Sequence, residues 1–228
     1  VVEGVNGTIF AYGQTSSGKT FTMQGSHDNE GILYLSAQDI FRHISMASDR
    51  DFLLRVSFVE IYNENVRDLL TPDQAPVNIR EDPKKGVYIE ATERIITSFD
   101  SILEALRTGE QHRRVETTAM NERSSRSHTI FRIVVESRQR GSEEDAENAD
   151  AVLVAALNLV DLAGSESVRH TGATGQRAKE GGKINQSLLS LSRVIHSLSQ
   201  VMWCALKEFR KGFDSNIKTG RRTCEFQR

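Results

Sequence analysis

The chain has 228 residues and carries 29 Lys and Arg against 31 Asp and Glu, so its formal net charge is −2 at pH 7. This length can form one large domain, and the balanced charge excludes a general nucleic-acid binder, so any basic contact surface must be local. Two cysteines, Cys204 and Cys224, give neither a disulfide framework nor metal-ligand spacing, which suits a reducing compartment. No apolar run reaches membrane-spanning length, and no signal peptide is evident.

The first predicted element is a strand over Gly7–Tyr12, because its apolar and β-rich residues suit a buried parallel strand. The residues after it fit G-x-x-x-x-G-K-[ST], a loop whose backbone N–H groups cradle a polyphosphate. Lys19 would reach the β- and γ-phosphates, and the Thr20 hydroxyl would hold Mg²⁺. The alternative is a chance match in a loop, which the preceding strand disfavours. The predicted phosphate-binding residues are Gly13, Gln14, Thr15, Ser16, Ser17, Gly18, Lys19 and Thr20.

The middle of the chain alternates strand and helix patterns. Phe52–Tyr62 predicts a strand, residues 77–89 predict a hairpin with a Pro-Lys-Lys-Gly turn, and Phe99–Arg113 predicts a helix. Two more strands are predicted at Thr129–Ser137 and Val152–Val160. This alternation favours an α/β fold, with a central, mostly parallel sheet and helices on both faces.

Two further segments could complete a nucleotide site. Residues 121–128 read NERSSRSH and place small hydroxyl side chains beside Arg126, which suits a loop that senses a γ-phosphate. An apolar run from Ala151 to Val160 ends in Asp161, where a carboxylate can bind Mg²⁺ through water, and Gly164 can bring its N–H to a γ-phosphate. Each segment alone also fits an ordinary polar loop or strand exit. Three parts in the right order argue against chance.

Together these segments make the chain resemble the motor domain of a kinesin, most closely the centromere-protein-E-like branch. The resemblance runs from Val5 to about Gln200 and rests on GQTSSGKT at 13–20, NERSSRSH at 121–128 and DLAGSE at 161–166. It implies a P-loop NTPase fold truncated at both ends, without the family's first strand and adenine contact or its last strand, last helix and neck linker. We expect residues 1–200 to form a partial motor domain and residues 201–228 to be a basic tail outside the family pattern.

The resemblance also implies the nucleotide, ATP, and its Mg²⁺ ion. In the family's first switch, Ser124 and Ser125 would close over the γ-phosphate, with Ser125 near the metal. In the second switch, Asp161 would contact Mg²⁺ through water, alongside the direct ligand Thr20. Phosphoryl transfer depends mostly on such positioning and on charge stabilisation.

Three other residues of the two switches have implied roles. Gly164 would sense the γ-phosphate. Arg126 and Glu166 match the family's pair that forms a salt bridge when the switches close and that helps to hold the attacking water. Because an Arg–carboxylate pair is geometrically demanding, it could report whether the γ-phosphate is present.

The implied partner is the microtubule, and the implied activity is a microtubule-stimulated ATPase in the cytoplasm, on the cytoskeleton. The predicted hairpin would present Arg80, Lys84 and Lys85 to acidic tubulin, although a solvated basic turn is the alternative. Apolar residues at a 3.6-residue spacing over 184–198 predict a helix, which in kinesins lies against tubulin with Asn185 at its contact end. No nucleic acid or membrane partner is expected, and no heptad array predicts a dimerising coiled coil in this chain.

Other functions remain as alternatives to a motor. One is a non-motile nucleotide- or microtubule-binding remnant that lacks the neck linker. A small GTPase would need a guanine-reading N-K-x-D, which does not occur. A myosin would share the P-loop and an SSR-type switch, but Ser127-His128 and DLAGSE fit a kinesin better.

Overall fold

The structure is a computed structural model of the chain, and it describes residues 1–26, 28–73, 76–83, 86–117, 125–140, 152–166 and 181–200. The chain divides into two compact units, Val1–Ile184 and Asn185–Arg228. Residues 181–200 are helical, as the apolar spacing over 184–198 predicts. In the part of the chain that the structure describes, no helix is long and apolar enough to cross a membrane.

A six-stranded sheet forms the centre of the first unit. Its strands run in the order β1-β8-β7-β2-β3, and β6 pairs with β2 off this path. A separate two-stranded sheet contains β4 and β5. The strands are β1 (Gly7–Ala11), β2 (Arg50–Tyr62), β3 (Asn65–Asp68), β4 (Ile79–Asp82), β5 (Gly86–Ile89), β6 (Arg94–Ile96), β7 (Ser127–Gln139) and β8 (Leu153–Asp161).

The direction of the strands corrects one prediction. Only β1 and β8 are a parallel pair among the described strands, whereas β8–β7, β7–β2, β2–β3 and β2–β6 are antiparallel. The α/β class is confirmed, but the expectation of a mostly parallel sheet is wrong. β2 and β7 pair along 13 residues each, from Arg50↔Gln139 to Tyr62↔Ser127, and the buried runs of such a central pair resemble those of parallel strands.

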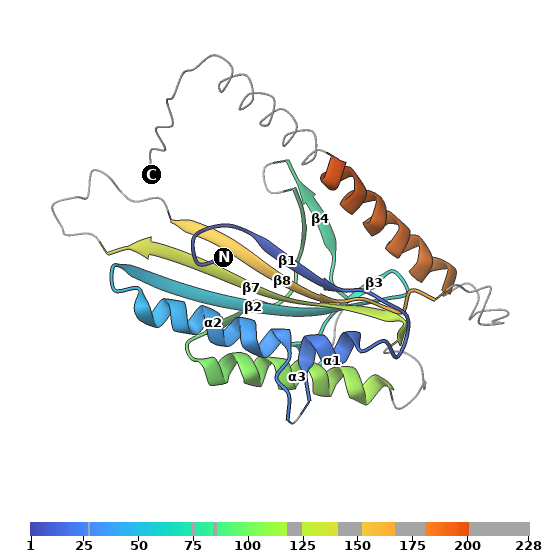
Figure 1. Cartoon of the computed structure of the whole chain (residues 1–228), viewed down its shortest axis with the longest axis horizontal. Helices are drawn as coiled ribbons and strands as arrows, with labels where there is room; N and C mark the ends of the chain where they lie inside the picture. The colour runs from blue at the N-terminus through green and yellow to red at the C-terminus, as the bar shows by residue number, and fades with distance from the viewer. Residues whose placement is uncertain are drawn as a thin grey trace, which may run out of the picture. The chain divides into compact units, whose positions relative to one another are not determined.

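Three helices pack on one face of this sheet, as Figure 1 shows: α1 (Lys19–Gln24), α2 (Ile32–Met46) and α3 (Phe99–Thr117). In α2, which the sequence analysis did not predict, Leu33, Ala37 and Ile40 recur every three or four residues and are buried. They join a core cluster that includes Phe58 of β2 and Phe131 of β7, whose rings meet edge to face at 5.3 Å. Helices on the second face stay a prediction.

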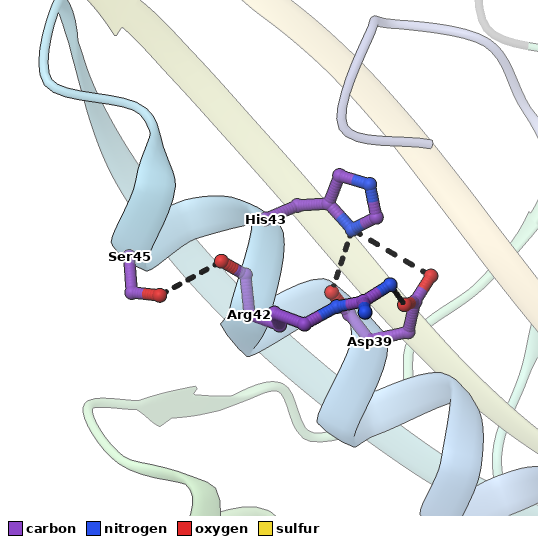
Figure 2. A network of polar contacts seen from close by, with 4 residues as sticks. All are labelled: Asp39, Arg42, His43 and Ser45. Atoms are coloured by element: carbon purple, nitrogen blue, oxygen red, sulfur yellow. Dashed lines mark hydrogen bonds and ion pairs between the residues drawn. The ribbon is translucent and has the colours of Figure 1, made fainter.

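The polar end of α2 is a surface network, which Figure 2 shows in close view. Arg42 donates to the Asp39 carboxylate at 2.5 Å, His43 lies 2.8 Å from the Asp39 carbonyl oxygen, and the Ser45 hydroxyl donates to the Arg42 carbonyl at 2.7 Å. The side chains of Arg42 and Asp39 are 67% and 55% exposed, so their ion pair contributes at most about 0.5 kcal/mol. All four residues belong to α2 and lie near its C-terminal end.

Helix α3 approaches the sheet closely at Gly109. Its N-terminus is fixed by a reciprocal cap, in which the Ser98 hydroxyl accepts from the Ser101 N–H and the Ser101 hydroxyl accepts from the Ser98 N–H. A Cβ added at Gly109 would lie 2.2 Å from Cδ1 of the buried Phe58 ring. The missing side chain therefore allows α3 to sit directly on β2.

We expect Gly109→Ala to destabilise the fold by about 1–3 kcal/mol, because overpacking forces the ring or the helix to shift. Urea unfolding of the variant and the parent chain measures this difference. The matched control is Gly182→Ala, also in a helix, where an added Cβ meets nothing within 4 Å and should stabilise by up to about 1 kcal/mol. Equal effects at the two positions would contradict close packing at Gly109.

Candidate functional site

Residues 13–18 lie between the end of β1 and the start of α1, and Lys19 and Thr20 are the first two residues of α1. Gly18 has φ +90° and Ser16 has φ +62°, a left-handed conformation in which glycine is unstrained. Lys19 folds back over the loop, and its Nζ donates to the carbonyl oxygens of Gly13 at 2.9 Å and Gln14 at 2.8 Å. The chain therefore forms a compact turn at this point, and the contact of Lys19 with a phosphate stays a prediction.

Thr20 and Asp161, the two residues predicted to hold Mg²⁺, are brought together by the parallel strands. β1 and β8 are in register at Ala11↔Asp161, so the loop after β1 and the end of β8 share one edge of the sheet. The Thr20 hydroxyl donates to Oδ2 of Asp161 at 2.6 Å. The other carboxylate oxygen, Oδ1, is buried and has no hydrogen-bond partner among the residues that the structure describes, which is unusual for a buried polar atom. A hydroxyl and an unsatisfied carboxylate fit the oxygen ligands and waters that Mg²⁺ prefers.

The segment after Asp161 is held by four consecutive backbone N–H groups. Each of these donors has an acceptor on a different part of the site. Three acceptors are backbone carbonyls and one is a side chain. The bonds are Leu162 N to Ala11 O at 3.2 Å, Ala163 N to His128 Nδ1 at 3.0 Å, Gly164 N to Ser125 O at 2.8 Å and Ser165 N to Gly13 O at 3.1 Å. The second switch is thus tied to the phosphate loop and to the first switch at once.

Glu166 reaches into the phosphate loop. Its carboxylate accepts from the Thr15 backbone N–H at 2.9 Å and from the Thr15 hydroxyl at 2.5 Å. Burial alone would raise the pKa of Glu166, but the hydrogen bonds from Thr15 and the charge of Lys19 outweigh it, so the pKa lies below its usual value. An anion is therefore favoured at this point of the loop.

Gly164 is the close neighbour of this contact. A Cβ at Gly164 would lie 2.3 Å from Oε2 of Glu166 and 2.5 Å from Oγ1 of Thr15. There is no room for a side chain while Glu166 occupies the loop. The φ angle of Gly164 is not in the left-handed range, so its backbone conformation does not require a glycine. A glycine is needed here because other atoms of the site come so close.

A buried imidazole lies under the second switch. His128 of β7 is 9% exposed, and its Nδ1 accepts from the Ala163 N–H. Burial lowers the pKa of His128, and the nearby Asp161 carboxylate opposes that shift only in part. The ring is therefore neutral in the neutral pH range, as an acceptor nitrogen requires.

Behind α1 lies a group of charged side chains. Nε2 of Gln24, the last residue of α1, donates to Glu110 of α3 at 2.6 Å. On the same helix Arg113 lies 3.7 Å from Glu110 and 3.7 Å from Glu60 of β2. Glu60 and Arg113 are buried, with side chains 1% and 7% exposed. This group joins the helix of the phosphate loop to α3 and the sheet.

The remaining predicted site residues lie in several places. The eight loop residues 13–20, and Ser125, Arg126, Asp161, Gly164 and Glu166, are all described and lie in one unit. Ser124, Lys84 and Lys85 lie outside the described residues. The predicted hairpin is present as β4–β5, and Arg80 on it pairs with Glu90 at 2.5 Å. Asn185 is helical and belongs to the second unit. The Arg126–Glu166 pair stays a prediction.

Sequence reasoning missed three contacts of the site. These are the bond between His128 and Ala163, the contact of Glu166 with Thr15, and the buried pair Glu60–Arg113. His128 ends the motif at 121–128, so a signal was present in the sequence. The other two contacts join segments that lie far apart in the chain, and no spacing rule points to them.

The chain matches a family model and many known proteins. The model is that of the kinesin motor domain, and it matches residues 1–211. Kinesin-like protein KIN-7I of Oryza sativa subsp. japonica is 52% identical over 201 residues, which are 87% of this chain and 16% of that protein. Human Centromere-associated protein E is 51% identical over 201 residues, 87% of this chain and 7% of that protein. The chain therefore spans less than a fifth of either relative.

Solved structures agree with this match. KIF14 with ADP in complex with a microtubule has a TM-score of 0.74 and 37% identity, over 87% of this chain and 57% of that one. A fast kinesin has a TM-score of 0.69 and 39% identity, over 79% of this chain and 51% of that one. These likenesses confirm the predicted P-loop NTPase fold and the predicted resemblance. The chain belongs to the kinesin motor domain family.

Proposed function

We propose that this chain binds ATP and hydrolyses it in a cycle coupled to microtubule binding and movement. The observation that carries the proposal is the pairing of Thr20 with Asp161 at the end of two parallel strands, where Oδ1 of Asp161 has no hydrogen-bond partner within the described part of the chain. The solved complex of KIF14 contains ADP and a microtubule, which supports the same nucleotide class and partner here. The proposed location of this chain in the cell is the microtubule cytoskeleton of the cytoplasm.

Each residue of the loop and switches has a proposed task. Lys19 neutralises phosphate charge, and the N–H groups of residues 13–20 bind the phosphate oxygens. Thr20 and Ser125 are proposed ligands of Mg²⁺, with Asp161 acting through a water. When bound, the ion would neutralise charge that develops on the phosphate oxygens. Ser124 is proposed to close over the γ-phosphate with Ser125.

The contacts of the second switch suggest how it answers to nucleotide. The Gly164 N–H is bonded to Ser125 O, so it must release that oxygen before it can donate to a γ-phosphate. Glu166 occupies the Thr15 N–H, and an incoming phosphate, also an anion, would displace it. A displaced Glu166 is then free to pair with Arg126, which closes the two switches. The exchange of Glu166 between Thr15 and Arg126 is thus proposed to report occupancy of the loop.

The surface that would meet tubulin is proposed from the hairpin and the helix. Arg80, Lys84 and Lys85 belong to or lie between β4 and β5, and Asn185 lies in the helical stretch 181–200. The negative charge of acidic tubulin would attract these basic residues, which mainly raises the rate of association, and salt screens this attraction. Binding should therefore weaken as ionic strength rises.

Phosphate release and microtubule co-sedimentation, run side by side on the 228-residue chain, test the proposal. We expect ATP-dependent phosphate release that microtubules stimulate, and its loss in Lys19→Ala, which no longer neutralises phosphate charge. The control Asp39→Asn changes only the surface network of α2 and should behave as the parent chain. Microtubule or nucleotide binding without phosphate release would favour the non-motile alternative, and absence of both would overturn the proposal.

A further inference from the structure

The contact between His128 and Ala163 differs in kind from its neighbours. Of the four N–H groups at 162–165, three donate to backbone carbonyls, and that of Ala163 donates to the His128 side chain. A substitution at His128 can therefore remove the acceptor of this one bond, whereas the three backbone carbonyls that accept the other bonds remain. His128 and Ala163 are 9% and 0% exposed, so no bulk water can replace a lost acceptor at this place.

The atoms of the bond are fixed by its donor. A backbone N–H only donates, so Nδ1 of His128 must carry a lone pair, and the proton of the neutral ring is on Nε2. The ring itself is anchored, because His128 is the second residue of β7 and pairs with Ile61 of β2. The next residue, Thr129, pairs with Asp161 of β8. The acceptor is thus part of the rigid sheet, and the donor is part of the switch.

The bond between Ala163 and His128 lies between a residue of the switch that stays in place and one that has to move. Asp161 precedes it by two residues and is held by the Thr20 hydroxyl. Gly164 follows it directly and is held by Ser125 O, a bond that must break when Gly164 turns toward a γ-phosphate. Between a fixed residue and a moving one, the chain needs a point about which to turn.

We propose that His128 is a positioning residue of the nucleotide site, and that its bond to Ala163 is the fixed pivot of the second switch. The inference rests on the proposed ATPase cycle. The Ala163 N–H stays on Nδ1 while Gly164 and Glu166 change partners. Asp161 then keeps its place opposite Thr20 in every state, and the motion is confined to residues after 163.

Three variants of His128 separate this role from core packing. In His128→Asn, Oδ1 can occupy the place of Nδ1 and accept the same N–H, although the smaller side chain leaves a cavity. In His128→Gln the amide lies further out, near the place of Nε2, and in His128→Leu there is no acceptor at all. If His128 acted only by packing, the Asn variant should be more damaged than the Leu variant. If its bond to Ala163 is the pivot, the Asn variant should keep more of the parent behaviour than either the Gln or the Leu variant.

The first measurement is amide hydrogen exchange in the full 228-residue chain. We expect the Ala163 amide to exchange on the order of 10-fold faster in Gln and Leu than in the parent chain and in Asn, as the loss of one buried acceptor implies. With a non-hydrolysable ATP analogue added to the parent chain, protection of Gly164 should change and that of Ala163 should not. Thermal unfolding, recorded beside it, shows whether any change is global.

The second measurement is steady-state phosphate release. Because the phosphate loop is untouched, KM for ATP should change little, while kcat falls on the order of 10-fold in Gln and Leu and recovers in Asn. Equal exchange at Ala163 in Asn and Leu, or a kcat that follows thermal stability across the three variants, would overturn the pivot. If Leu does not fold, the comparison of Asn with Gln decides. If the chain bound no nucleotide, the proposed function would fail, while exchange at Ala163 would still test the bond.

Discussion

Gly164→Ala should lower ATP turnover on the order of 10²-fold and leave the fold almost as stable as before. The added methyl would lie 2.3–2.5 Å from the carboxylate oxygens of Glu166 and from the hydroxyl of Thr15. Glu166 is a flexible side chain, so the folded state can relieve the clash by moving the carboxylate away. The clash with the Thr15 hydroxyl remains, because Thr15 belongs to the phosphate loop, and it keeps the Gly164 N–H from coming close to the phosphate. The loss of one well-placed donor in a transition state commonly costs about 10²–10³ in rate.

Phosphate release and urea unfolding of the variant measure the two halves of this result. ADP affinity is the internal control, because the bonds of Lys19 to Gly13 and Gln14 within the phosphate loop do not involve Gly164. We expect ADP to bind within a few-fold of the parent value. Turnover near that of the parent would show that Gly164 needs no close approach, and a parallel loss of ADP binding would place the damage in the phosphate loop instead.

The phosphate loop could be predicted because its information is local. A β-rich run, two glycines and a Lys-Thr pair specify a turn that residues 7–20 form largely among themselves. The position of Asp161 was predictable for a related reason, since a carboxylate that ends an apolar run must lie at a strand tip. Which strand lies beside it is not local, and the register Ala11↔Asp161 is seen only in the structure.

The direction of the central strands could not be predicted in this way. β2 is buried without interruption from Val56 to Glu60, and β7 is buried at most of its residues, so these stretches lack the alternation that marks an antiparallel strand with one wet face. Helix α2 was missed although its apolar spacing is regular, because no motif drew attention to it. The contact of Glu166 with Thr15 spans 151 residues, and it depends on how the chain folds back over the loop.

The buried pair Glu60–Arg113 should dominate the stability of the helix face. We expect Arg113→Met to destabilise the chain by about 3–5 kcal/mol, because it removes the Arg113 cation from beside the buried Glu60 carboxylate. The two side chains are 1% and 7% exposed and lie 3.7 Å apart, so water cannot screen or solvate the charge that remains. A domain typically has a free energy of unfolding of about 5–15 kcal/mol, so this loss is a large share of it. Urea unfolding of the variant and the parent chain will measure the loss.

The double variant Glu60→Gln/Arg113→Met separates the charge from the contact. With both charges removed and similar volumes kept, most of the lost stability should return, since replacing a buried pair is often neutral where breaking it is not. A loss below about 1 kcal/mol in the single variant, or no recovery in the double variant, would mean that Arg113 acts by packing alone. Recovery would instead show that the pair holds α3 against β2 mainly because its two buried charges neutralise each other.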